Sequence, residues 1–152
     1  MLQLAMPFAI QPMLEADIPA TVRVELEAFR SHPRIPMLFP KGYTPDVYAY
    51  YEDNKIEGYH DDTQRFMEAV NDETGEIVAC SEWTFALDPD AMVNKKPINP
   101  NEQPPANWPE GGNWRLKRFY KVEWEHWRRG VFGSRPYIGM INLLLSAFPI
   151  IV

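Results

Sequence analysis

The chain is poor in cysteine and histidine, and basic residues are outnumbered by acidic ones. Cys80 is the only cysteine among 152 residues, which excludes an internal disulfide and a multi-cysteine zinc site. The three histidines do not have the spacing of metal ligands, so we predict no metal site. Fifteen Lys and Arg against 21 Asp and Glu give a net charge of -6, which argues against a nucleic-acid partner. With a single thiol, a reducing, cytoplasmic environment is the expectation.

The sequence also lacks an apolar run of the length that a membrane helix needs. Residues 137–152 form its longest apolar stretch, but they contain Pro149 and fall short of the roughly 20 residues that span a bilayer. This stretch therefore predicts a buried strand, and we do not expect the chain to bind a membrane. A C-terminal membrane anchor remains the alternative, because arginines precede the run as a positive flank: Arg128, Arg129 and Arg135.

Apolar residues and prolines are plentiful. The composition is 45% hydrophobic and 13% aromatic, which is enough for one packed domain over residues 1–152. Six of the 15 prolines lie between residues 88 and 113, where no helical or strand periodicity is present. This segment predicts a flexible, solvent-exposed insert within the domain.

Periodicity and capping signals predict three helices and four strands. Ile18, Val22, Leu26 and Phe29 share one helical face, and Thr44-Pro45 is typical of a helix start. The predicted helices cover residues 18–30, 45–58 and 114–132, and the predicted strands cover 8–11, 66–71, 76–87 and a segment from 137 onward. Residues 31–43 predict a loop that its prolines hold in place. The order predicts an α/β (α+β) fold with a mixed, mostly antiparallel sheet and packed helices.

Two segments carry a family resemblance. The hairpin from Phe66 to Trp83 and the opening from Phe8 through Asp17 resemble those of the GCN5-related N-acetyltransferase (GNAT) family. The proline-rich insert before a tryptophan-bearing helix is similar to that of fungal-type members. The resemblance covers residues 8–87 and 114–139, and it implies a partial GNAT-like acyl-CoA N-acyltransferase fold. It also implies transfer of an acetyl group from acetyl-CoA to an amine of a small molecule or peptide.

The resemblance also implies roles for particular residues. Glu82 is the candidate base that removes the amine proton, with a surface glutamate on a strand as the alternative interpretation. The candidate substrate-binding residues come from the first two helices, their connecting loop and the hairpin: Phe29, Phe39, Tyr43 and Trp83. No residue is assigned to the cofactor.

The tail departs from the family pattern. Arg135–Gly139 resembles the start of the strand that leads to the family's glycine-rich pyrophosphate turn, but no glycine follows Gly139. We therefore expect a truncated, N-terminal half of the domain that neither binds acetyl-CoA usefully nor transfers acetyl groups. The alternative is a small non-enzymatic interaction protein that self-associates through residues 137–152 or touches a membrane.

Overall fold

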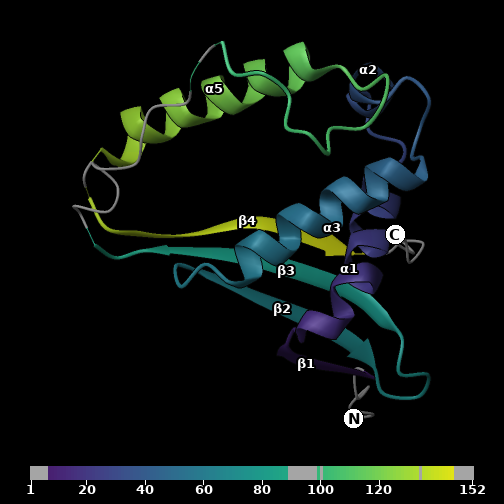
Figure 1. The fold of residues 1–152 in the computed structure, drawn as a ribbon. Coiled ribbons are helices and arrows are strands. Elements are labelled where there is room, and N and C mark those ends of the chain that lie inside the picture. The colour runs from purple at the N-terminus through teal and green to yellow at the C-terminus, as the bar shows by residue number, and fades with distance from the viewer. Residues whose placement is uncertain (1–6, 89–98, 100, 134, 146–152) are drawn as a thin grey trace.

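The structure is a computed structural model that describes residues 7–88, 99, 101–133 and 135–145. Figure 1 shows the arrangement of its helices and strands. In chain order the elements are β1 (Phe8–Pro12), a short 3₁₀ helix (Glu15–Asp17), α1 (Ile18–Phe29), α2 (Ile35–Leu38), α3 (Pro45–Tyr59), β2 (Gln64–Asn71), β3 (Ile77–Ala86), α5 (Trp114–Phe132) and β4 (Tyr137–Leu145). All of the predicted helices and strands are confirmed, with bounds that differ only at their ends.

The four strands form one antiparallel sheet in the order β1-β2-β3-β4. The predicted hairpin is the β2–β3 pair, in which Phe66 lies opposite Glu82. Gly75 ends its turn with a φ of 72°, a conformation that glycine adopts without a steric penalty. A register shift between Glu82 and Trp83 bends the β3–β4 pair at the middle of the sheet.

Helices α1, α3 and α5 all lie on one side of the sheet, with α5 farthest from it (Figure 1). The apolar stripe of α1 is fully used, because Ile18, Val22 and Leu26 are 1%, 0% and 1% exposed. They form the main core with residues of the neighbouring elements, namely Met13, Leu38, Phe39, Val47 and Phe66. This core fixes α1 and α3 against the sheet and so fixes every side chain that they direct toward β3.

Two expectations about the connecting segments need correction. The predicted loop at 31–43 contains the short helix α2, which starts at Ile35 with Pro36 in its first turn. Most side chains between 101 and 113 are exposed, as expected, but Trp108 is half-buried and Pro109 is fully buried. The indole of Trp108 lies 5.0 Å from the Tyr50 ring, which anchors the end of the insert on α3. Residues 89–98 and 100 lie outside the described residues, and the flexibility of the insert stays a prediction.

The opposite face of the sheet has no helix over it in the described part of the chain (Figure 1). Ile10 and Ile138 on this face are 76% and 57% exposed. Residues 137–145 form the edge strand β4, which confirms the predicted strand. The expected burial is wrong at Ile138 and Met140, which are 57% and 48% exposed. No helix among the described residues is long and apolar enough to cross a membrane.

Candidate functional site

Helix α5 is attached at both ends and leaves space beneath its middle. Its first turn is capped by Asn113, whose side-chain oxygen accepts a hydrogen bond from the Leu116 amide at 3.1 Å. The Asn113 amide donates to the Leu38 carbonyl at 2.8 Å, which ties the helix start to α2. At the other end Gly133 has a φ of 59°, and the chain then turns into β4.

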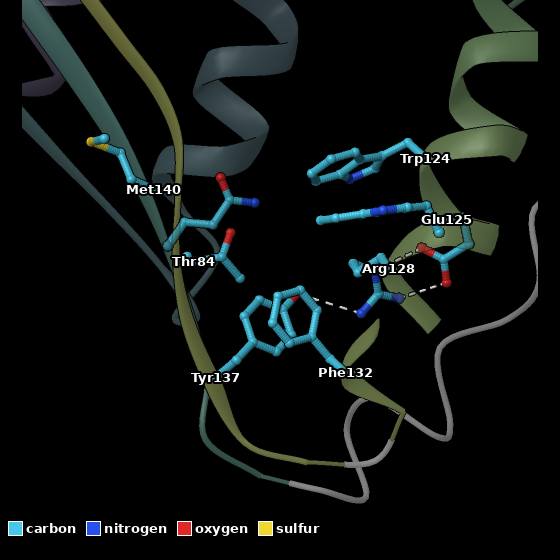
Figure 2. Close-up of a pocket in the computed structure, with 10 residues that line it drawn as sticks. Thr84, Trp124, Glu125, Arg128, Phe132, Tyr137 and Met140 are labelled. Carbon is cyan, nitrogen blue, oxygen red and sulfur yellow. Dashed lines mark hydrogen bonds and ion pairs between the residues drawn. The ribbon is translucent and has the colours of Figure 1, made fainter. Parts of the chain in front are cut away.

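A cavity of about 380 Å³ lies between the second half of α5 and strands β2, β3 and β4. Aromatic rings form much of its wall. Trp124 and Trp127 stack with centroids 5.0 Å apart, and Phe132 stacks on Tyr137 at 4.3 Å. Figure 2 shows these rings around the cavity, with Thr84 and Met140 on the sheet side. Such a wall suits the flat, apolar part of a small molecule.

The charged groups in this cavity neutralise one another. Glu125 accepts hydrogen bonds from the guanidinium groups of Arg128 and Arg129, both at 2.6 Å. Burial alone would raise the pKa of Glu125, but these two arginines outweigh it and hold the pKa below its usual range. Arg128 also donates to the Tyr137 hydroxyl at 3.4 Å (Figure 2). The acid is therefore a structural partner of the arginines.

A second group of charges lies where α1, α3 and β3 meet. The Lys55 ammonium lies 2.9 Å from a carboxylate oxygen of Glu25 and 4.0 Å from one of Glu82. The side chains of Lys55, Glu25 and Glu82 are 6%, 9% and 20% exposed. Burial alone would lower the pKa of Lys55, but the carboxylates, Glu25 above all, outweigh it and raise the pKa. Lys55 is therefore a buried cation with a dedicated partner, while Glu82 is the most accessible of the three.

Glu82 lies close to the cavity under α5. Glu82 and Thr84 are two residues apart on β3, so they point to the same face of the sheet, roughly 7 Å apart along the strand. Thr84 lines the cavity under α5, and Glu82 lines a separate, smaller hollow with Asn54 and Lys55. The sheet thus places a partly exposed carboxylate two residues along β3 from one wall residue of the aromatic-walled cavity.

The predicted acceptor residues are divided between two clusters. Phe39 is 2% exposed and belongs to the main core, with the Tyr43 ring 6.4 Å away. Phe29 packs in a separate cluster with Val24 and Cys80. The structure therefore brings Phe39 and Tyr43 together but not Phe29, and it buries Phe39 behind other side chains. Their substrate-binding roles stay predictions.

Trp83 lies on the other face of the sheet from Glu82, because adjacent strand residues point in opposite directions. Its neighbours there line an apolar hollow that includes Met67, Phe85 and Ile138. The indole nitrogen donates to the Ser81 hydroxyl at 3.1 Å. Glu82 and Trp83 therefore face opposite sides of the sheet, and the substrate-binding role of Trp83 stays a prediction.

Sequence reasoning missed the rings and arginine that surround the cavity: Trp124, Trp127, Arg128, Phe132 and Tyr137. The available signal was the pair of tryptophans three residues apart on one face of a helix. Cys80, by contrast, is buried, and burial raises the pKa of its thiol to about 11. A thiol with this pKa is a poor nucleophile near neutral pH.

Comparisons with known proteins support the fold but give no sequence relative. No protein-family model and no curated protein sequence matches the chain. A solved structure described as histone acetyltransferase HPA2 and related acetyltransferase, from Corynebacterium glutamicum, matches with a TM-score of 0.50 and 18% identity. A mosquito arylalkylamine N-acetyltransferase like 5b matches with a TM-score of 0.46 and 13% identity.

The chain spans only part of these structures. The matches cover 93% and 91% of this chain but 62% and 61% of the two solved chains. The four-stranded antiparallel sheet with its packed helices is the fold of GNAT-like acetyltransferases over this length. This likeness establishes the fold alone.

Proposed function

We propose that this chain supplies the acceptor-binding part of an N-acetyltransferase, and that its acceptor is an amine with an apolar or aromatic body. The observation that carries the proposal is the cavity under α5, which has stacked aromatic walls and is lined on β3 by Thr84, two residues along the strand from the partly exposed Glu82. The ring or chain of the amine would pack on Trp124 and Trp127. The ammonium group would lie toward Glu82.

Glu82 is the proposed proton acceptor for this amine. An amine attacks an acyl group only after it loses a proton, and a carboxylate within hydrogen-bond reach can take that proton. Lys55 lies closer to Glu25 than to Glu82, at 2.9 Å against 4.0 Å, so its charge is compensated mainly by Glu25. Glu82 is also the more exposed of the two acids, with a side chain 20% exposed against 9% for Glu25.

The residues near the end of β4 do not fit acetyl-CoA. A pyrophosphate needs oriented N–H groups or cations. The backbone from Leu143 to Leu145 is paired with β3, and the sequence has no charged residue from Met140 onward and no glycine after Gly139. We therefore propose that these 152 residues alone bind acetyl-CoA only weakly and do not transfer acetyl groups. The proposed likeness to fungal-type members rests on the proline-rich insert before α5.

Calorimetric titration of the purified chain tests both parts of the proposal. We expect phenethylamine to bind, and Glu82→Gln to weaken its binding about tenfold through the loss of a charge-assisted hydrogen bond. Glu76→Gln, an equal change at an exposed hairpin residue, is the control and should leave binding unchanged. Acetyl-CoA should show no binding below about 1 mM. A dissociation constant below about 100 µM, roughly -5.5 kcal/mol, would contradict the proposed absence of a cofactor site.

A second candidate function is self-association, favoured by the uncovered face of the sheet. On this face Ile138 is 57% exposed, and β4 is an edge strand whose outer side pairs with no strand in the described part of the chain. An open apolar edge favours pairing with a second copy. Sedimentation at increasing concentration should then show dimers that Ile138→Asp removes. A concentration-independent monomer would exclude this candidate.

A further inference from the structure

A second and wider cavity lies on the other side of the tryptophan pair. It has a volume of about 650 Å³ and is lined by Arg34, Lys117, Tyr120, Glu123, Trp124 and Trp127. Trp124 and Trp127 line both this cavity and the one described above, so the stacked indoles stand between the two. The proposed acceptor site makes no use of this space.

Among the described residues, no carboxylate lies within ion-pair distance of Arg34 or Lys117, the cations of this cavity. Lys117 is half-buried, and its ammonium lies 5.9 Å from the centroid of the Tyr51 ring. Burial lowers the pKa of Lys117, and the neighbouring charges of Lys121 and Arg34 lower it further, while Glu25 opposes them. The Arg34 guanidinium lies over the Tyr120 ring at 5.1 Å. A bound anion would supply the counter-charge that this pair lacks.

The balance of charge and the aromatic surface define the ligand class. Arg34 and Lys117 contribute two positive charges, and the exposed Glu123 on the same wall contributes one negative charge, so the cavity carries a net charge of about +1. A single carboxylate matches this charge better than a phosphate ester does. Trp124 and Trp127 are 53% and 51% exposed, and they offer a flat ring surface directly beside the cations.

We propose that this cavity binds an aromatic monocarboxylate. The carboxylate lies between Arg34 and Lys117, and the aromatic ring packs against the Trp124–Trp127 pair. This site is distinct from the proposed amine site, and it needs neither acetyl-CoA nor catalytic activity.

Calorimetric titration with 2-naphthoate and with its neutral analogue 2-naphthamide tests the proposal on the full chain. We expect naphthoate to bind about tenfold more tightly than the amide, and Lys117→Met to remove that difference. Lys121→Met is the matched control, because it removes the same charge from α5 at a lysine that Glu102 already pairs at 3.1 Å. The control should change naphthoate affinity less than about twofold.

Arg34→Gln, at an exposed residue, gives the same test without disturbing buried groups, and it should also weaken naphthoate binding. Equal affinities for acid and amide, or equal losses from Lys117→Met and Lys121→Met, would overturn the proposal. So would the absence of naphthoate binding to the wild-type chain at millimolar concentration. Phenethylamine titrated into the same samples reports the proposed amine site separately, so the failure of one site is distinguishable from the failure of the other.

Discussion

Helices α1 and α5 carry similar apolar stripes but have different surroundings. In α1 the stripe residues Ile18 and Val22 are 1% and 0% exposed. In α5 the stripe residues Trp124 and Trp127 are 53% and 51% exposed, and they border two cavities. Spacing tells which face of a helix is apolar, but the packing of the other elements decides whether that face becomes core or the wall of a binding site.

The charged residues of the two regions differ in the same way. Glu25 of α1 and Lys55 of α3 form an ion pair within the packed layer, with side chains 9% and 6% exposed. Lys117 of α5 is half-buried beside a cavity and has no carboxylate partner among the described residues. The Glu25–Lys55 pair holds α1 and α3 together. Lys117, in contrast, can be neutralised by the negative charge of a ligand.

Among substitutions that test the difference between the two regions, Lys55→Met should lower the free energy of unfolding most. The change leaves the Glu25 carboxylate buried without its cation, which costs about 3–5 kcal/mol of unfolding free energy. Lys121→Met removes an ion pair whose side chains are 43% and 39% exposed, and it should cost less than about 1 kcal/mol. Urea denaturation measures both. A loss below about 1 kcal/mol for Lys55→Met would mean that Glu25 finds other partners.

A smaller loss of unfolding free energy is expected at Trp108, which joins the end of the insert to α3 and α5. Its ring lies 5.0 Å from both Tyr50 and Trp114, and its N–H donates to the Gly112 carbonyl at 3.0 Å. Trp108→Ala should cost about 2–3 kcal/mol, because it removes a partly buried indole from these contacts. Trp127→Ala, at a half-exposed indole of the cavity wall, should cost less than about 1 kcal/mol.

Urea denaturation and limited proteolysis of the same two variants check this expectation. Trp108→Ala should speed cleavage between residues 101 and 113, because the anchor of that segment is lost. Equal stability losses for the two tryptophans would show that Trp127 in the cavity wall is packed as tightly as Trp108.

The sequence predicted the elements well because their signals are local. Periodicity located α1, and a proline-bearing cap located α3. The order of these elements also predicted the fold class. The site was predicted less well, because it depends on contacts between distant segments. The cavity wall combines α5 with β4, and strand alternation separates Glu82 from Trp83 although they are neighbours in the chain.

Trp108 shows the same limit. Its surrounding composition is typical of an exposed insert, and only the three-dimensional proximity of Tyr50 and Phe39 turns it into an anchor. The role of Lys117 was also out of reach. A lysine on the polar side of a predicted helix gives no local sign that Tyr51 and Arg34 lie beside it.

The smallest expected change in stability concerns Glu68, a buried acid on β2. It is 2% exposed, one carboxylate oxygen accepts a hydrogen bond from Gln11 at 2.8 Å, and the other has no hydrogen-bond partner among the described residues. Burial raises the pKa of Glu68, and the charge of Asp17 raises it further, while the Gln11 hydrogen bond opposes both. Folding therefore shifts the Glu68 carboxyl toward its protonated form relative to the unfolded chain.

This raised pKa fixes the sign of the pH dependence. A group whose pKa is higher in the folded chain contributes stability below its unfolded pKa, about 4.3 for glutamate, and loses that contribution as pH rises through the folded value. Glu68→Gln keeps the shape but cannot ionise, so it should be more stable than the wild type at pH 7 by about 1 kcal/mol and nearly equal at pH 4. Glu76→Gln, at an exposed residue, should show no such difference. Urea denaturation at both pH values tests this prediction. If Glu68→Gln is less stable than the wild type at pH 7, the ionised Glu68 carboxylate stabilises the folded chain, and the prediction is wrong.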